Sequence, residues 1–498
     1  MDREFHFLIF VSAIIASVPM STRKQFILGA IILLLTAWFS TGYNHFDEHF
    51  QVVEFAGLKL GLTEKANLPW EYNCQMRPAV QPLFVFLIYK TVALTGFRDP
   101  FFIAFLLRLF SGAISFLSIF LVYQFYSRKL QNDKLRYILL FLSLFLWFSV
   151  YNSVRFSSET IAGRIFLIGL AVFILKEKPT LLTYLATGVL LGLSFIIRYQ
   201  MAFMILGAAA WLLIIRRSAI REFLCFSGGI ILMIFAGILI DHWFYGDWVL
   251  TTWNYFQQNV LQGKAAAFGV QPWHYYLTET FNSAIPPFSL AYILAVVIYI
   301  WFNPKDILSW AILPFLLGHF AIAHKEIRFI FPVIGFLPVM ITGSIGIIEE
   351  KRGKEFIEKR WVNWITYAFV FTNLVMTVIL VFRPADPQIS LYRKLYNEYK
   401  TPTRLCYNDE NPYHRAKVDV YFYKRKELAF VKVDSAEVIM PVKDTVTLYV
   451  TKAPELPVNK QFQPLLIYSS LPQWIKKFNF NHWIERTDFW YVYELQSK

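Results

Sequence analysis

The chain has 498 residues, 56% of them apolar and 16% charged, and a formal net charge of +14. Soluble globular proteins have roughly a quarter of their residues charged, so this composition excludes that class and predicts a polytopic α-helical membrane protein. The basic residues form short clusters between apolar runs, which is typical of cytoplasmic loops and argues against nucleic acid as a partner.

The first segment, 1–25, carries an apolar stretch at 5–19 that is short for a membrane span. It is expected to be a signal-like segment or an interfacial helix, or else a start-site artefact that precedes a natural start at Met20. Cys74 and Cys406 lie on the same expected side and could pair, although two unpaired thiols fit the sequence better.

About eleven apolar segments are expected to cross the membrane. They lie at 26–42, 101–125, 137–152, 160–175, 181–197, 200–215, 222–240, 285–302, 307–323, 327–348 and 361–382. Basic clusters that begin at 23, 128, 176, 216, 304 and 351 should face the cytoplasm. All of them fall on that side only if the apolar stretch 79–96 does not cross.

Residues 43–100 are therefore expected to form one long first outer loop with two juxtamembrane helices. The first helix begins at Asp47 and should place Asp47, Gln51 and Glu54 on one face, because these residues are spaced at i, i+4 and i+7. The second helix is the stretch 79–96, which should lie in or near the membrane surface.

The transmembrane domain, 26–384, is followed by an outer soluble domain, 385–498. In this last segment polar and apolar residues alternate in VDVYFYKRKELAFVKV, and TVTLYVT and FWYVYEL have strand-like compositions. About 110 residues can bury a core of their own, so we expect a small α+β domain.

Asp47 and Glu48 stand in NHFDEHFQ, where the chain leaves its first span. A carboxylate at a membrane interface can take the proton of an attacking hydroxyl, and a low-dielectric cleft would raise its pKa and make it a better base. The alternative is a solvated helix start, because acidic residues favour the first helical turn.

HKEIRF places His324, Lys325 and Arg328 around Glu326 at the outer end of a span. Lysine and arginine together can hold a phosphate. Snorkelling to the interface explains Lys325 alone but explains the density of charge poorly, so we favour a ligand site.

Arg155 and Glu159 lie four residues apart at another outer end, and they either pair with each other or belong to the site. Arg164, farther inside the same span, needs a partner such as Glu159 or a ligand phosphate. Arg198 is expected to be an interfacial anchor.

The loop that begins at 241 is rich in aromatic residues and poor in charge. Most of its aromatic residues suit a belt at the membrane surface. Asn254, Asn259 and His274 could form hydrogen bonds with hydroxyl groups of a sugar.

Several stretches resemble, in chain order, the dolichyl-phosphate-mannose-dependent α-mannosyltransferases: NHFDEHFQ, PWEY, MRPAVQPLF, DHWFYGDW, NYFQQNVLQG, FGVQPWHYYL and HKEIRFIFP. This family includes the glycosylphosphatidylinositol mannosyltransferases and the enzymes that extend the lipid-linked oligosaccharide of N-glycosylation. Its members commonly have proline where this chain has Phe46, a change that bears on turn geometry more than on chemistry. The resemblance covers about 25 to 335, and the C-terminal domain does not share it.

The resemblance implies a C-type glycosyltransferase fold and an inverting transfer of a sugar, usually mannose, from a polyprenyl-phosphate donor to a hydroxyl of a lipid-linked glycan acceptor. It makes Asp47 the general base and Glu48 a neighbour that positions the acceptor or shares the proton. His324, Lys325 and Arg328 would contact the donor phosphate, which leaves already charged, so cations can replace a general acid.

The remaining substrate contacts are expected among polar residues of the outer side: His45, Gln51, Arg77, Arg155, Glu159, Asn254, Asn259, His274 and Glu326. No stretch resembles the aspartate-x-aspartate metal site of soluble nucleotide-sugar enzymes, so we expect no metal and no cofactor. The expected partners are the lipid bilayer, the donor and the acceptor.

The main alternative is a transporter or flippase of lipid-linked saccharides, which would need midplane charges and broken helices in corresponding halves. The sequence indicates neither. Another C-type enzyme, such as a transferase of aminoarabinose to lipid A or a protein mannosyltransferase, should lack HKEIRF. A structural scaffold is a more distant third. The chain has no Asn-x-Ser/Thr sequon, which favours a bacterial inner membrane over the endoplasmic reticulum, with the site on the periplasmic or lumenal side.

Overall fold

The computed structural model describes residues 20–130, 132–452, 461–471 and 489–497, and these form two compact units. Unit 1 comprises the described part of Met1–Ser40, with Glu71–Phe84 and Phe105–Arg383. Unit 2 comprises Thr41–Trp70, Val85–Ala104 and the described parts of Pro384–Lys498. Most of the expected N-terminal segment, 1–19, lies outside the described residues.

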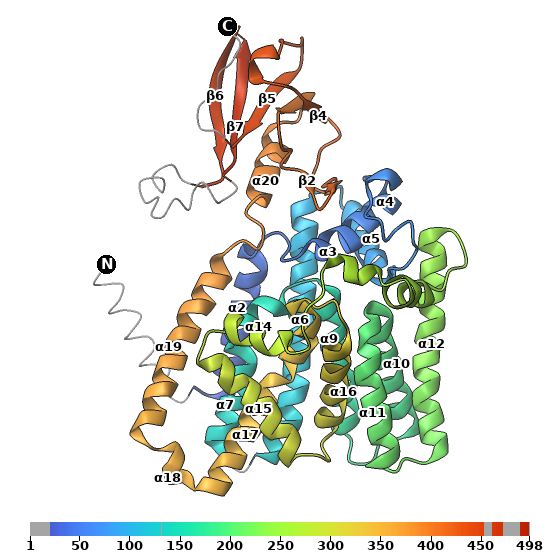
Figure 1. Cartoon of the computed structure of the whole chain (residues 1–498), viewed down its shortest axis with the longest axis vertical. Helices are drawn as coiled ribbons and strands as arrows, with labels where there is room; N and C mark the ends of the chain where they lie inside the picture. Colours follow the sequence, from blue (N-terminus) through green and yellow to red (C-terminus); the bar gives the residue numbers. More distant parts are fainter. Residues whose placement is uncertain (1–19, 131, 453–460, 472–488, 498) are drawn as a thin grey trace. The chain divides into compact units, whose positions relative to one another are not determined.

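Unit 1 is helical (Figure 1). Its long helices are α2 (Thr22–Phe39), α6 (Pro100–Lys129, whose first residues belong to unit 2), α7 (Asp133–Phe145), α8 (Trp147–Ser153), α9 (Ser158–Ile174), α10 (Leu181–Ile197), α11 (Ala202–Ile214), α12 (Ile220–Tyr245), α15 (Phe288–Phe302), α16 (Ile307–Ala321), α17 (Leu337–Arg352) and α19 (Arg360–Phe382). Shorter helical segments are η3 (Tyr199–Met201), α13 (Thr251–Phe256), η4 (Gln257–Leu261), η5 (Lys264–Phe268), α14 (Tyr275–Ser283), η6 (Ile327–Gly335) and α18 (Lys354–Ile357).

All eleven predicted spans coincide with helices. Among the described residues, α2, α6, α12 and α19 are each long and apolar enough to cross a membrane. Two bent pairs pass the same test together, α7 with α8 at 51° and η6 with α17 at 64°. The helices in the other five segments have only 13 to 17 residues, below the ~20 that a perpendicular span needs, so their crossing stays a prediction.

The contact between α10 and α12 shows why the sequence places glycine inside apolar helices (Figure 1, green). A Cβ atom on Gly188 would lie 2.0 Å from the carbonyl oxygen of Phe226, and one on Gly229 would lie 2.5 Å from that of Leu185. Two backbones can approach this closely only where neither carries a side chain.

The first outer loop is helical, as predicted. It contains α3 (Phe46–His49), a π-helical turn η1 (Phe50–Glu54), α4 (Phe55–Leu60), η2 (Lys65–Asn67) and α5 (Val80–Ala93), which contributes residues to both units. With 14 residues, α5 is too short to cross a bilayer unaided, which agrees with its expected position at the membrane surface.

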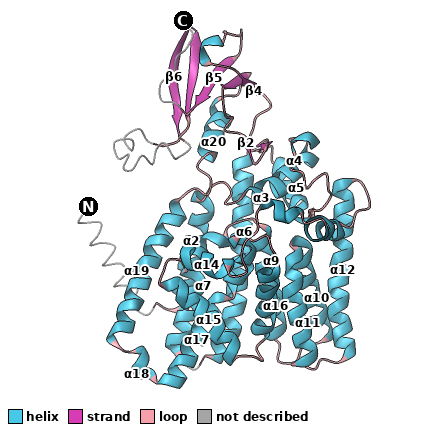
Figure 2. Ribbon diagram, in the orientation of Figure 1, coloured by secondary structure: helices cyan, strands magenta, loops and turns pink. Residues whose placement is uncertain are grey.

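The C-terminal segment forms the predicted small α+β domain in unit 2, and Figure 2 shows the strands gathered there. Its elements are α20 (Ile389–Glu398), η7 (Ala436–Val438), β1 (Thr403–Tyr407), β2 (His414–Arg415), β3 (Val418–Asp419), β4 (Leu428–Lys432), β5 (Val446–Thr451), β6 (Phe462–Ser469) and β7 (Tyr491–Ser497). The main sheet has the order β4-β1-β5-β7-β6, in which β1 is parallel to β4 and β5, and β7 is antiparallel to β5 and β6.

The long strand expected at 418–433 is only partly present, because β3 ends at Asp419 and β4 begins at Leu428. The residues between them do not extend a ladder. Instead, Phe422 and Tyr423 are buried, and the backbone N–H of Phe422 bonds to a side chain of the first outer loop. Burial against that loop therefore overrides the alternating pattern.

Candidate active site

The acidic pair lies in the first turn of α3, in unit 2. His45 is the N-cap residue, and its Nδ1 accepts a hydrogen bond of 3.2 Å from the backbone N–H of Asp47. Glu48 reaches back so that its Oε2 accepts from the backbone N–H of Asn44 at 2.9 Å. These two bonds satisfy N–H groups that a helix start leaves without intrahelical partners.

The two carboxylates have different surroundings. The side chain of Asp47 is 28% exposed, whereas Glu48 is 8% exposed. Glu48 thus contributes to the shape of the turn, and Asp47 is the member of the pair that solvent or a substrate can reach. Gln51, in the π-helical turn, is half-buried.

Glu54 anchors this helix within unit 2. It is fully buried, its Oε2 accepts from the hydroxyl of Thr63 at 2.5 Å, and its Oε1 lies 3.0 Å from His49 Nε2. The same Oε1 accepts from the backbone N–H groups of Tyr421 and Phe422 at 2.8 and 2.9 Å. One carboxylate therefore fastens the first outer loop to the C-terminal segment of the chain.

The predicted face shared by Asp47, Gln51 and Glu54 is wrong. A π-helical turn has more residues per turn than an α-helix, so it shifts the residues that follow it around the helix axis. Glu54 consequently points into the core of unit 2, while Asp47 remains partly exposed.

HKEIRF forms a charged cluster in unit 1. Arg328 donates to Glu326 through Nε at 2.7 Å and through Nη2 at 3.1 Å, a bidentate geometry. His324 lies 3.2 Å from Glu326 through Nε2, and its Nδ1 lies 2.9 Å from the carbonyl oxygen of Gly269. The motif thus orders itself internally.

Lys325 faces the backbone. Its ammonium donates to the carbonyl oxygen of Gln271 at 3.1 Å and to that of Ile322. The residue is 4% exposed, and burial lowers the pKa of its amine from the usual value. Two of the three ammonium protons are used in these bonds, so one remains for another acceptor.

Glu159 connects this cluster to α10. Its Oε1 lies 2.8 Å from Arg198 Nη1 and 3.3 Å from Arg328 Nη1, and the carboxylate is buried. Arg198, expected to be an interfacial anchor, is instead a buried partner of this carboxylate. The sequence analysis missed this role, because an arginine at the end of an apolar run has the same pattern in both cases.

The other two arginines of this region hold the helices together. Arg155 donates through Nη2 to the carbonyl oxygen of Ser40 at 2.6 Å and to its hydroxyl at 2.9 Å. Arg164 donates to the hydroxyls of Ser153 at 3.0 Å and Ser149 at 3.4 Å. The partners expected for Arg164 were Glu159 or a phosphate, and its hydrogen bonds go to serines of α8 instead.

The predicted residues of the 69–78 stretch and the aromatic loop have mainly local partners. Arg77 pairs with Glu71 at 3.3 Å, and Asn254 donates to the carbonyl oxygen of Gln75 at 3.0 Å. Asn259 donates to the carbonyl oxygen of Tyr255, within its own helical segment, and His274 is exposed at the start of α14. The structure therefore joins Glu159, His324, Glu326 and Arg328 in one network that these residues do not enter through these bonds.

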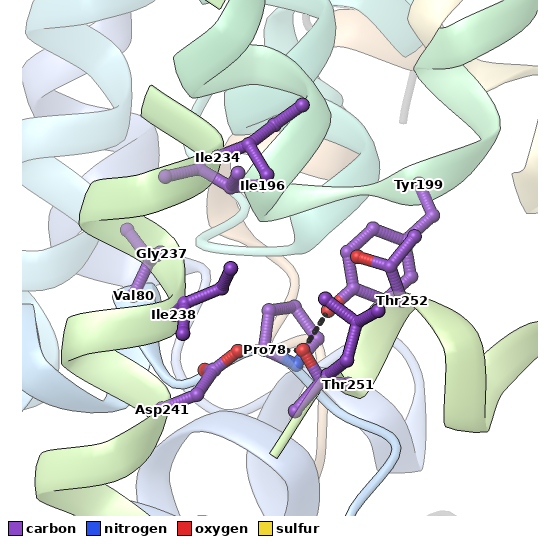
Figure 3. Close-up of a pocket in the computed structure, with 11 residues that line it drawn as sticks. Pro78, Val80, Ile196, Tyr199, Ile234, Gly237, Ile238, Asp241, Thr251 and Thr252 are labelled. Atoms are coloured by element: carbon purple, nitrogen blue, oxygen red, sulfur yellow. Dashed lines mark hydrogen bonds between the residues drawn. The ribbon is translucent and has the colours of Figure 1, made fainter. Parts of the chain in front are cut away.

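A small pocket lies beside Asp241, a residue that the sequence analysis did not single out (Figure 3). Asp241 accepts from the backbone N–H of Ala79 at 2.8 Å and from the hydroxyl of Thr251 at 2.5 Å, and Tyr199 Oη lies 2.5 Å from the same hydroxyl. The pocket holds about 10 Å³, close to the space of one water molecule, and isoleucines line much of it. It is too small for a sugar.

No group of three or more histidine, cysteine or acidic side chains that could hold a metal ion occurs within the described part of the chain. The three cysteines are free thiols.

Comparison with known proteins connects these features to one family. Residues 25–425 match the Alg9-like mannosyltransferase family, which is well over half of the chain. The chain is similar to GPI alpha-1,2-mannosyltransferase 3 of Xenopus laevis, with 26% identity over 66% of this chain and 59% of that protein. It is also similar to GPI mannosyltransferase 3 of Candida albicans, with 26% identity over 64% of this chain and 63% of that protein. It thus spans less than two thirds of either relative.

Among solved structures, the fold is similar to ArnT from Cupriavidus metallidurans bound to undecaprenyl phosphate. The TM-score is 0.54 at 11% sequence identity, over 94% of this chain and 97% of that chain. This likeness confirms the C-type glycosyltransferase fold. Both relatives are eukaryotic, so they do not support the preference for a bacterial inner membrane. The family match confirms the resemblance read from the motifs: this chain belongs to the Alg9-like mannosyltransferase family.

Proposed function

We propose that this multi-pass membrane protein is an inverting hexosyltransferase. It moves a sugar, which we take to be mannose, from a polyprenyl-phosphate donor to a hydroxyl of a lipid-linked glycan acceptor at the outer or lumenal face of the membrane. The names of the relatives support the sugar, and the undecaprenyl phosphate in the ArnT structure supports a polyprenyl-phosphate ligand for this fold.

Asp47 is the proposed general base, and its accessibility is the observation that carries the proposal. Of the acidic pair, only Asp47 has a substantially exposed side chain, and it stands on a helix start that His45, Glu48 and the buried Glu54 hold in place. A base must reach the acceptor hydroxyl and must be held still while the proton moves. Glu48 is the proposed positioning neighbour.

The donor phosphate is the proposed ligand of the HKEIRF cluster. His324, Lys325 and Arg328 lie on the outer side of α16 and η6, where cations can stabilise the negative charge that grows on the leaving phosphate. Lys325 retains one ammonium proton for such a contact after its two bonds to backbone carbonyls. Glu326 and Glu159 would keep Arg328 oriented.

Other polar residues of the outer side are proposed to contact the substrates or to shape the loops that do: His45, Gln51, Arg77, Arg155, Asn254, Asn259 and His274. Arg155, Arg77 and Asn254 would act by holding backbone, because they bond to Ser40, Glu71 and the carbonyl of Gln75.

The test is transfer of mannose by the purified full chain in detergent, from a short-chain polyprenyl-phosphate mannose to total membrane glycolipid. Asp47→Asn should lower the rate by about 10²–10⁴-fold, the usual contribution of a general base. Glu48→Gln should have a smaller effect. Glu64→Gln, which changes an exposed acid of the same outer loop, is the matched control and should behave as the native chain.

Each reaction is repeated with EDTA, and activity should survive because the proposed chemistry uses no metal. If Glu48→Gln is the inactive variant, the class of enzyme stands and the two roles exchange. If the native chain never consumes the donor although Asp47→Asn folds normally, the transferase proposal fails, and a transporter of lipid-linked saccharides becomes the better account.

A further inference from the structure

Three buried side chains of unit 1 have polar atoms without a hydrogen-bond partner within the described part of the chain. They are Nε and Nη2 of Arg198, Oη of Tyr276 and Nε2 of His319. The three residues are 6%, 2% and 1% exposed. An isolated buried polar group costs free energy, so several of them in one region require a partner that is absent from the chain itself.

These atoms belong to one place in the fold. Arg198 ends α10, Tyr276 lies in α14 and His319 lies in α16, and the rings of Tyr276 and His319 are 6.2 Å apart. Arg198 is close enough for its charge to act on both. Its guanidinium also lies 5.3 Å from the ring of Phe329, the last residue of HKEIRF.

Tyr276 shows the same proximity through its acidity. Burial raises the pKa of Tyr276, and the nearby positive charge of Arg198 works in the opposite direction. Its hydroxyl lies near the backbone of Glu326 but makes no hydrogen bond of normal geometry there. The region therefore adjoins the charged cluster.

The hydrogen-bonding capacities of the three residues differ. Arg198 can only donate, and only its Nη1 is engaged, with Glu159 and Ser158. His319 Nδ1 lies 2.8 Å from the carbonyl oxygen of Phe315, so this nitrogen carries the proton and Nε2 of the neutral ring can accept. Tyr276 can do both. A ligand that suits all three must accept from Arg198 and donate to His319.

Charge narrows the choice further. Within unit 1, Arg198, Lys325 and Arg328 stand against Glu159 and Glu326, which leaves one positive charge in excess among these five side chains. A phosphodiester carries one negative charge, and a sugar linked to it brings hydroxyl groups that can donate. Ordered water alone would satisfy the hydrogen bonds but would leave the charge uncompensated.

We infer that Arg198, Tyr276 and His319 form a subsite for a phosphate-linked sugar, in which Nε and Nη2 of Arg198 hold a phosphodiester oxygen while His319 Nε2 and Tyr276 Oη hold a hydroxyl of the sugar. The inference rests on the proposed function, because the ligand is the proposed donor. It makes Arg198 the principal cation for the phosphate, since Arg328 already donates to Glu159 and Glu326.

The test compares binding of three probes to the purified full chain: a short-chain prenyl-phosphate mannose, the matching prenyl phosphate, and the matching prenyl alcohol. Arg198→Gln should weaken both phosphate-bearing probes by about tenfold or more, the usual loss for a charge-assisted hydrogen bond, and leave the alcohol unchanged. Tyr276→Phe keeps the ring and should weaken only the mannose-bearing probe. Arg136→Gln, an arginine of the expected cytoplasmic side with an exposed side chain, is the control.

Thermal unfolding of each variant identifies loss of fold. If Arg198→Gln does not fold, Arg198→Lys and Tyr276→Phe decide, because both keep the bulk of the residue. Unchanged affinity of every probe in these variants would mean that water fills the region, and the subsite would be rejected although the native chain transfers sugar. A native chain that binds no phosphate-bearing probe and transfers nothing would instead remove the proposed function.

Discussion

Two buried carboxylates, one in each unit, are used in opposite ways. Glu54 of unit 2 accepts from the backbone N–H groups of Tyr421 and Phe422 and from Thr63, so most of its partners are neutral. Glu159 of unit 1 is held between Arg198 and Arg328. The first carboxylate fixes the backbone that carries Asp47, and the second keeps cations in place. The same residue type thus serves geometry in one unit and electrostatics in the other.

Glu159→Gln should give the largest loss of stability. The amide cannot neutralise two buried guanidinium groups, and removing one partner of a buried ion pair costs about 3–5 kcal/mol. The midpoint of thermal unfolding in detergent should fall clearly below that of Glu350→Gln, which neutralises an exposed acid at the end of α17. A midpoint equal to that control would show that the arginines have another counter-charge and would break the comparison.

Glu54→Gln should cost less, about 1–3 kcal/mol, because the amide oxygen can still accept from the two backbone N–H groups. Mannose transfer should fall with it through a lower kcat, since Asp47 stands on the same helix, while the KM for the donor should change little. Glu54→Ala removes the acceptor altogether and should be worse in both respects. A Glu54→Gln variant less stable than Glu159→Gln would reverse the assigned roles.

The thiols give the smallest and simplest contrast between the units. Cys406 of unit 2 is 1% exposed and burial raises the pKa of its thiol, whereas Cys74 of unit 1 is half-buried. Less thiolate at a given pH means slower alkylation, so maleimide at neutral pH should label Cys74 first. Raising the pH toward the elevated pKa should accelerate Cys406. Equal rates in the native chain, with Cys74→Ser as reference, would contradict the burial of Cys406.

Patterns along the chain predicted much of this fold. Apolar runs located all eleven helical segments, and the bookkeeping of basic clusters identified 79–96 as a non-spanning helix, which appears as the 14-residue α5. These predictions succeeded because they depend on length and composition, which are local properties. The strand at 418–433 failed, because its backbone and side chains are used for contacts within unit 2.

The candidate site was predictable in its motifs and less so in its partners. NHFDEHFQ and HKEIRF were found from the density of ionisable residues at the expected outer ends of spans. The sequence did not show that Glu159 pairs with Arg198 and Arg328, which are 39 and 169 residues away. Spacing reveals only neighbours within a helix or strand, and these partners come from other helices.

The sequence by itself determined the class of protein, the positions of its helices and the residues able to take a proton or bind a phosphate. Only the tertiary structure decided how each charge is used: Asp47 is partly exposed while Glu48 and Glu54 are spent on backbone, and Arg198 keeps two buried nitrogens without a protein partner within the described residues. The physical reason is that hydrophobicity and charge act residue by residue, whereas burial and hydrogen bonding depend on which distant segments meet.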